Sequence, residues 1–374
     1  MLRNKIIRLL YKLFAKPIFF HFNPESVHNF VTNYAEFIGN HKFSIAVIKK
    51  IFSQNKKYPT LSQTISGINF VSPVGLAAGF DYDAKLTQIL PSLGFGFGSV
   101  GTITNRAYGG NPKPMLGRLP KSKSLMVNKG FKNNGAVTVS NKLSRKQFAY
   151  PVGISIGRTN DPSLNQAQSI SDIVSAFKIF EGSDVVHSYY ELNISCPNLF
   201  GDISFYLPHK LNDLLLSIQK LKIPIPLFIK MPIEKDNKTV LALLSVISKH
   251  KFVTGVIFGN LQKNRKDPAL DADEVAKFTT GNFSGKPTWN RSNELIKIAY
   301  EKYGDQLIII GCGGVFSAED AYYKITLGAS LVQLITGLIF EGPQLVAEIN
   351  EGLEKILQKN GFKHISEAVG SATR

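Results

Sequence analysis

From residue 60 onward, short apolar runs alternate with stretches in which apolar residues recur every three or four positions. Apolar runs of about four to eight residues are typical of buried strands, and the three-to-four spacing is typical of amphipathic helices. The pattern predicts strands at 74–78, 96–101, 152–156, 185–194, 226–230, 255–259, 307–311 and 331–335. Helices are predicted between them, at 171–180, 211–221, 240–249, 293–303, 318–327 and 343–357.

Eight apolar strands that alternate with helices predict an α/β protein, a (β/α)8 or TIM barrel. A doubly wound sheet is the alternative, and that fold places a Gly-x-Gly-x-x-Gly turn after its first strand. Here the glycine-rich turn, Gly311-Cys312-Gly313-Gly314, follows the seventh predicted strand, which favours the barrel. Ahead of the first strand, alternation around Ser66-Gly67 predicts a hairpin over 63–71.

Residues 1–57 follow a different pattern, which predicts a small helical module ahead of a barrel domain over 58–374. Asn23 is suited to a helix cap and Pro24 to the first helical turn. Apolar residues then recur at helical spacing from Val27 to Ile38, and Gly39 ends the helix.

The first 22 residues contain five Lys or Arg and no acid. In a helical projection, one arc holds Lys5, Arg8, Lys12 and Lys16, and the opposite arc holds Leu2, Ile6, Leu9, Leu10, Leu13 and Phe14. A membrane span needs about 20 mostly apolar residues, and neither a span nor a signal peptide fits this charge pattern. We expect a helix that lies on an anionic membrane surface; a helix packed on the protein body, or a targeting presequence, is the alternative.

Composition narrows the class of protein further. The chain has 374 residues, of which 44% are hydrophobic and 19% charged, and this is ordinary globular composition. The net charge of +17 favours an anionic surface or anionic ligands, and no Arg-rich tract with interleaved aromatics points to nucleic acid. Two cysteines, Cys196 and Cys312, make no disulfide framework, which indicates a reducing compartment. No spacing of His, Cys or carboxylates predicts a metal site.

The chemistry of a TIM barrel lies at the carboxyl ends of its strands. The fourth predicted strand ends in Asn193-Ile-Ser-Cys-Pro-Asn198, and Asn128 and Asn260 lie on neighbouring loops. Amides at these positions suit a planar ring that carries N–H and C=O groups. Cys196 is the candidate proton acceptor, because its setting can lower the thiol pKa from about 8.5. A buried apolar role is the alternative, and we expect that role for Cys312.

Two further features indicate a bound cofactor. Gly313 and Gly314 after the seventh strand, with Thr336-Gly337 after the eighth, predict a phosphate cradle rather than simple tight turns. Lys230 ends the apolar fifth strand, where an ammonium group is costly without an anionic partner unless it reaches solvent. Together with the small residues of 75–79, these features predict redox chemistry on a small ring compound.

In these motifs the chain resembles the dihydroorotate dehydrogenases. The likeness covers nearly the whole chain and includes Gly75-Leu-Ala-Ala-Gly-Phe-Asp81, Gly94-Phe-Gly-Phe-Gly-Ser-Val-Gly-Thr102, Asn193-Ile-Ser-Cys-Pro-Asn198, Ser284-Gly-Lys-Pro287, Ile309-Ile-Gly-Cys-Gly-Gly314 and Gly328-Ala-Ser-Leu-Val-Gln333. The resemblance implies an FMN-containing barrel that oxidises dihydroorotate to orotate in pyrimidine synthesis.

The resemblance also implies roles for single residues. Cys196 would take the proton and Lys230 would stabilise the reduced flavin. The substrate would be held by Asn128, Lys129, Gly130, Phe131, Asn193, Asn198 and Asn260. FMN would be held by Ala78, Gly79, Thr102, Ser155, Asn193, Lys230, Gly259, Gly285, Gly313, Gly314, Ile335 and Thr336.

The subclass signals are mixed. The segment Phe22-Asn-Pro-Glu25 with His28 resembles the membrane-associated, quinone-reducing class 2 enzymes, whereas Cys196 resembles the base of the soluble class 1 enzymes. Tyr82 stands where the family has a lysine that touches substrate and flavin. We hypothesise that Lys129 or Lys132 supplies that charge.

The sequence therefore predicts a class 2-like, quinone-dependent dihydroorotate dehydrogenase, peripherally attached to the cytoplasmic side of the cell membrane. Three alternatives remain open. They are a dihydroorotate dehydrogenase with a soluble acceptor (fumarate or NAD), a flavin-free phosphosugar lyase or isomerase, and an inactive barrel that serves as an interaction protein.

Overall fold

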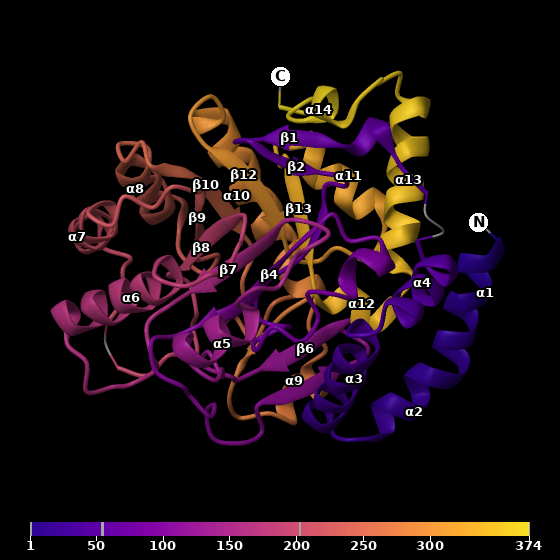
Figure 1. The fold of residues 1–374 in the computed structure, drawn as a ribbon, viewed down its shortest axis with the longest axis horizontal. Coiled ribbons are helices and arrows are strands. Elements are labelled where there is room, and N and C mark those ends of the chain that lie inside the picture. Colours follow the sequence, from indigo (N-terminus) through magenta and orange to yellow (C-terminus); the bar gives the residue numbers. More distant parts are fainter. Residues whose placement is uncertain (1, 54–55, 202, 374) are drawn as a thin grey trace.

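The computed structural model of this chain describes residues 2–53, 56–201 and 203–373, and its centre is a closed barrel of eight parallel strands (Figure 1). Around the barrel the strands are β3 (Val74–Leu76), β4 (Phe97–Ile103), β7 (Val152–Ile156), β8 (Tyr189–Asn193), β9 (Leu227–Met231), β10 (Val253–Phe258), β12 (Ile308–Cys312) and β13 (Leu331–Leu334). Each of them overlaps a strand predicted from the apolar pattern. The predicted TIM barrel is confirmed.

Helices between the strands cover the outside of the barrel (Figure 1). They are α5 (Ala136–Leu143), α6 (Gln166–Glu181), α7 (Pro208–Gln219), α8 (Asn237–Ile247), α10 (Trp289–Tyr303), α11 (Ala318–Thr326), α12 (Thr336–Glu341) and α13 (Leu345–Lys359), with the short α9 (Ala272–Ala276) and α14 (Ile365–Ala368). Several begin at a side-chain cap, such as Asp236 for α8 and Ser317 for α11, which satisfies backbone N–H groups that have no partner within the helix.

The interior of the barrel is filled by aromatic rings. Phe97, Tyr189 and Phe228 pack edge to face with centroids 5.7–6.4 Å apart, a favourable geometry for aromatic pairs. The rings need room on the neighbouring strands. A Cβ at Gly153 would lie 2.1 Å from the Tyr189 ring, and one at Gly75 would lie 2.4 Å from the Phe97 ring.

The predicted hairpin is also confirmed, as β1 (Gln63–Ile65) and β2 (Ile68–Phe70). Ser66 and Gly67 both have positive φ, +49° and +79°, as a two-residue hairpin turn requires. Ile65 and Phe70 join the apolar cluster inside the barrel, so the hairpin closes that end of the core.

A second, three-stranded antiparallel sheet was not predicted. It consists of β5 (Leu116–Leu119), β6 (Ser124–Val127) and β11 (Asn282–Phe283). These strands are short, and the third comes from a distant part of the chain, so the local pattern is weak. Contacts between β5 and α3 place the sheet beside the amino-terminal helices.

The amino-terminal helices lie together along one flank, beside α12 and α13 (Figure 1). They are α1 (Leu2–Leu10), a π-helical turn (Tyr11–Ala15), α2 (Lys16–His21), α3 (Pro24–Gly39) and α4 (Lys42–Ile51). Asn23 caps α3 by accepting N–H groups of Glu25 and Ser26, as predicted. No helix in the described part of the chain is long and apolar enough to span a membrane.

Three of the four basic residues predicted on one arc contact α12 or α13, whereas Lys5 is exposed. Arg8 pairs with Glu348 at 3.7 Å, Lys12 pairs with Glu341, and Lys16 lies 5.0 Å from the Phe340 ring centroid. The alternative interpretation, a helix packed on the protein body, therefore holds for these residues. The opposite arc is exposed and apolar: Ile6, Leu9, Leu10, Leu13 and Phe14 have 48–61% of their surface exposed.

The crowded barrel interior yields a prediction about stability. Gly153→Ala should lower the free energy of unfolding by about 1–3 kcal/mol, the usual cost of overpacking a core, because the added methyl group meets the Tyr189 ring. Urea denaturation followed by fluorescence measures this change. Gly109→Ala is the matched control, since no atom lies within 4 Å of its added Cβ; equal destabilisation of both variants would contradict the prediction.

Candidate active site

A cavity of about 670 Å³ opens at the carboxyl ends of the barrel strands and continues between the amino-terminal helices. Its barrel end is lined by Ala78, Gly79, Thr102, Asn193, Cys196 and Lys230, and its other end by Tyr11, Phe19, Val27, Phe30, Tyr34 and Phe52. The residues come from both parts of the chain that the sequence pattern distinguished. One cavity therefore joins the polar mouth of the barrel to an apolar compartment.

A second cavity of about 90 Å³ adjoins the first and shares Ala78, Lys230, Asn260, Leu261, Ser284, Ile335 and Thr336 with it. Gly259, Gly285, Gly313 and Gly314 also line it. Among the described residues that form this wall, none carries a carboxylate. The small cavity is thus suited to an anionic group at the end of a larger ligand.

Close packing at this cavity explains its glycines. Gly313 and Gly314 have φ of +99° and +74°, a region that other residues rarely adopt. A Cβ on Gly313 would lie 2.4 Å from Thr288 Oγ1. The hydroxyl groups of Ser284 and Thr336 are hydrogen-bonded at 2.8 Å on the same wall. Glycine backbone and hydroxyl groups on a wall without carboxylates fit a phosphate group.

Three of the predicted asparagines line the large cavity, and hydrogen bonds fix their side chains. Asn193 donates to Thr102 Oγ1 at 2.8 Å. Asn260 donates to the Ser195 carbonyl and hydroxyl groups at 2.8 and 2.5 Å. Asn198 donates to the Val127 carbonyl at 2.9 Å. The amides are held in place before any ligand binds.

Two predicted site residues do not line either cavity. Asn128 accepts a hydrogen bond from Asn111 at 3.0 Å and donates to the Pro112 carbonyl at 3.2 Å. Ser155 is fully buried and shares a hydrogen bond of 2.9 Å with Thr102. Both residues lie behind the cavity wall and contact residues or loops that form it.

Sequence reasoning missed Asn111, which connects several of these loops. Its amide nitrogen donates to Asn128 Oδ1 and to the Asn198 carbonyl at 3.0 and 2.9 Å. Its oxygen accepts from Tyr108 and Asn160 at 2.6 and 2.9 Å. Asn111 follows no predicted strand, so its position in the sequence does not mark it as a residue of the barrel mouth.

Cys196 lines the large cavity, but its ionisation differs from the prediction. Burial raises the pKa of the thiol to about 12, although the Asn198 N–H, Arg158 and Lys230 act in the opposite direction. The expected lowering of the pKa is wrong, because desolvation of the thiolate outweighs its polar neighbours. Ser195 is fully buried and donates its hydroxyl to Asn193 Oδ1 at 3.1 Å.

Lys230 is 4% exposed and lines both cavities. The β8–β9 register places it directly beside Asn193. Strand pairing therefore fixes an ammonium group next to an amide at the junction of the two cavities.

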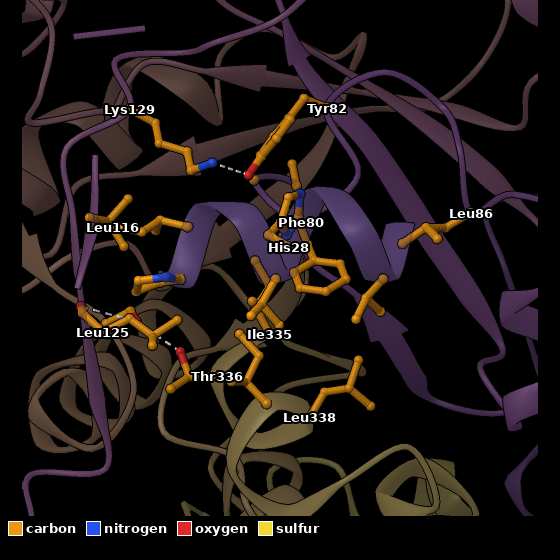
Figure 2. A pocket seen from close by; sticks show the side chains of 18 of the residues that line it. His28, Phe80, Tyr82, Leu86, Leu116, Leu125, Lys129, Ile335, Thr336 and Leu338 are labelled. Atoms are coloured by element: carbon orange, nitrogen blue, oxygen red, sulfur yellow. Dashed lines mark hydrogen bonds between the residues drawn. The ribbon is translucent and has the colours of Figure 1, made fainter. Parts of the chain in front are cut away.

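Tyr82 and Lys129 point toward one another in the cavity wall (Figure 2). Lys129 Nζ donates to the Tyr82 hydroxyl and lies 4.3 Å from the ring centroid. Burial lowers the pKa of Lys129 to about 8. Lys132 instead pairs with Glu25 at 2.7 Å. Of the two lysines considered, Lys129 is the one whose amine meets Tyr82.

His28 of α3 lies against the other side of this pair. Its ring centroid is 4.9 Å from both the Tyr82 and the Phe80 rings. Burial, reinforced by Lys129, lowers the pKa of His28 to about 3, so the imidazole is neutral at physiological pH. Next to it, Gly130 and Phe131 line the cavity, and Phe131 has a φ of +66°, a strained value for a bulky residue.

Arg118 of β5 is a further residue that sequence reasoning missed. It lines the apolar part of the cavity, donates to the Phe22 carbonyl at 2.7 Å and lies 4.7 Å from the Phe20 ring centroid. It places a guanidinium group between the barrel mouth and the amino-terminal helices. The unpredicted small sheet positions it there, so no motif signalled it.

The sequence profile of the dihydroorotate dehydrogenase family matches residues 60–357. Relatives named dihydroorotate dehydrogenase (quinone) include that of Trichodesmium erythraeum, 34% identical over 94% of this chain and 95% of the relative. That of Acidithiobacillus ferrooxidans is 35% identical over 95% of this chain and 98% of the relative. Among solved structures, the DHODH of Eimeria tenella in complex with ferulenol has a TM-score of 0.83, with 26% identity over 94% of this chain and 96% of that one. The chain belongs to the dihydroorotate dehydrogenase family.

Proposed function

We propose that this member of the dihydroorotate dehydrogenase family oxidises (S)-dihydroorotate to orotate in de novo pyrimidine synthesis, with FMN as cofactor and a membrane quinone as electron acceptor. The observation that carries the proposal is the single cavity that joins the polar barrel mouth to the apolar compartment between the amino-terminal helices. The quinone-dependent names of the relatives agree with it.

FMN fits the two adjoining cavities, because the smaller suits a phosphate and the larger begins at Ala78 and Gly79, the small residues that follow β3. The flavin ring would lie against Ala78, Gly79, Thr102, Asn193 and Lys230, and the phosphate in the wall of Gly259, Gly285, Gly313, Gly314, Ile335 and Thr336. Ser155 acts through Thr102. FMN held there would supply the hydride acceptor and the electrons for the quinone.

The substrate would occupy the polar part of the large cavity. Asn193, Asn198 and Asn260 offer amides to its ring, with Gly130 and Phe131 beside them. Asn128 acts from behind the wall, because Asn111 bonds both its amide and the Asn198 carbonyl. Cys196 would accept the proton from C5 as the hydride leaves C6, and Lys230 would contact the flavin ring.

The apolar end of the cavity would admit the quinone, and residues 1–57 would form the membrane-facing module. Besides the exposed arc of Ile6, Leu9, Leu10, Leu13 and Phe14, helix α3 exposes Phe30, Tyr34 and Phe37, which are 59–64% exposed. Apolar side chains on adjacent helices can enter a lipid interface together. The protein would attach peripherally to the cytoplasmic side of the cell membrane.

The central test is an anaerobic visible spectrum before and after addition of dihydroorotate. The flavin absorbance should bleach, and Cys196→Ala should retain the flavin but slow bleaching by about 10²–10⁴-fold, the usual contribution of a general base. Cys196→Ser keeps a proton acceptor, so its bleaching rate should lie between those of the wild type and Cys196→Ala. Undiminished bleaching in Cys196→Ala would exclude Cys196 as the base, and no bleaching in the wild type would exclude the substrate.

A second prediction concerns the substrate carboxylate. Lys129→Met should weaken orotate binding about tenfold or more, which corresponds to about 1.4 kcal/mol, since the ammonium group beside Tyr82 is lost. Titration of the oxidised flavin spectrum with orotate measures the dissociation constant without turnover. Lys132→Met is the matched control, because the amine of Lys132 already pairs with Glu25. Equal losses of orotate affinity in the two variants, or no loss in either, would show that another residue supplies the positive charge.

A third prediction concerns the membrane. The double variant Leu9→Glu, Leu13→Glu should bind neutral phosphatidylcholine vesicles about tenfold more weakly and lose turnover with long-tailed quinones, because it charges the exposed apolar arc. Flavin reduction by dihydroorotate should persist. Val137→Glu changes a similarly exposed valine on α5 and serves as the control. Normal vesicle binding by the double variant would refute this attachment surface.

A further inference from the structure

Lys324 of α11 is a lysine whose side chain is completely buried. Its amine donates hydrogen bonds to two side chains of α10, to Ser292 Oγ at 3.0 Å and to Asn293 Oδ1 at 2.8 Å. The same amine lies 4.8 Å from the centroid of the Trp289 ring, whose face attracts a cation. These neighbours accept its hydrogen bonds, but none of them carries a negative charge.

The charge of this ammonium group lacks an anionic partner. Among the residues that the structure describes, no carboxylate forms an ion pair with Lys324. The acid one turn earlier on α11, Asp320, pairs with Lys286 at 3.2 Å and accepts from the Phe316 N–H group at 2.8 Å. A buried cation is costly unless an anion compensates it, so an anion bound close to Lys324 would stabilise it.

A short chain of hydrogen bonds links Lys324 to the wall of the smaller cavity. Ser292, which accepts from the lysine, donates its own hydroxyl to the Cys312 carbonyl at 2.6 Å. Cys312 lines that cavity. A Cβ placed on Gly311 would lie 3.1 Å from Cδ of Lys324, so the stem of the lysine packs directly behind the end of β12.

We infer that Lys324 is a positioning residue that favours the FMN phosphate in the smaller cavity by placing a positive charge behind its wall. The inference rests on the proposed function, because the anion bound there would be the phosphate of FMN. The described residues of that wall carry no carboxylate, and a buried charge acts over a longer distance than one in water. Lys324 is not a lining residue; it acts through its charge and through the Cys312 carbonyl that Ser292 holds.

Two other lysines lie near this cavity. Lys230 lines both cavities and is proposed to contact the flavin ring. Lys286 follows Gly285 of the cavity wall, but its side chain is 35% exposed and its amine pairs with Asp320, so water and a carboxylate both weaken its field. Lys286 therefore offers a matched control for the completely buried Lys324.

The charge of Lys324 depends on pH in the neutral range. Burial lowers the pKa of its amine to about 7; Lys286 acts in the same direction, and Cys312 and Asp320 act in the opposite one. Burial also raises the pKa of Cys312, so that thiol stays neutral near pH 7. Bound phosphate would favour the ammonium form. FMN should therefore bind more weakly as the pH rises above about 7 and the lysine without bound phosphate loses its proton.

The test compares FMN with riboflavin, which has the same ring but no phosphate. Equilibrium dialysis of the flavin-free full chain gives both dissociation constants, and their ratio measures the preference for the phosphate. At pH 7, Lys324→Met should lower this preference about tenfold and leave riboflavin binding unchanged. In the wild type the preference should fall about tenfold between pH 7 and 9, where the phosphate stays dianionic. Lys324→Met should abolish that pH dependence.

A second variant cancels the charge without removing the lysine. Asn293→Asp keeps the outline of the side chain but places a carboxylate where the amide oxygen accepts from Lys324 at 2.8 Å. It should lower the preference for FMN about as much as Lys324→Met does. The control Lys286→Met should keep the preference within about twofold of the wild type, because solvent screens that charge.

Each outcome decides the inference. A selective loss of FMN affinity in both Lys324→Met and Asn293→Asp supports it. Equal losses of FMN and riboflavin affinity would show a purely structural role and overturn it, as would a wild-type preference in either variant or an equal loss in Lys286→Met. If Lys324→Met does not fold, Asn293→Asp and the wild-type pH dependence still decide. A wild type that binds neither flavin would instead refute FMN as the cofactor, so the two proposals fail distinguishably.

Discussion

The closure of eight parallel strands into one barrel is the constraint on which the site depends. Closure brings all the strand carboxyl ends to one mouth, so Thr102 of β4, Asn193 of β8 and Lys230 of β9 meet although they are far apart in the chain. The aromatic rings inside the barrel fix the spacing of the strands, since Gly75 and Gly153 leave room for a ring and nothing more. This packing fixes where the strands end, and so where these side chains stand at the mouth.

Burial of side chains at the mouth has electrostatic consequences. Burial dominates the ionisation of three groups that line the cavity: it raises the pKa of Cys196 to about 12, and lowers those of His28 to about 3 and Lys129 to about 8. Each charge here depends on a specific partner rather than on water. Lys129 meets the Tyr82 hydroxyl.

The amino-terminal helices extend this cavity beyond the barrel. Their basic residues pair with acids of α12 and α13, and α12 begins at Thr336 in the wall of the smaller cavity. The helices are therefore anchored to the element that also forms the proposed phosphate site. Anchoring by the basic arc leaves the apolar arc outward, and this orientation suits a lipid interface.

The sequence by itself determined the barrel, because apolar runs that alternate with amphipathic helices leave few other ways to bury their surfaces. It also determined which strand ends carry polar groups, and the motifs around Cys196, Gly313 and Gly314 were sufficient to indicate the family. Only the tertiary structure decided which groups meet. Contacts between distant segments decided four features. They are the small sheet that carries Arg118, the hydrogen bonds that Asn111 makes to several loops, the contact of Tyr82 with Lys129 rather than Lys132, and the outward orientation of the apolar arc. The tertiary structure also decided the ionisation of Cys196, because desolvation depends on the folded surroundings and cannot be read from the local sequence.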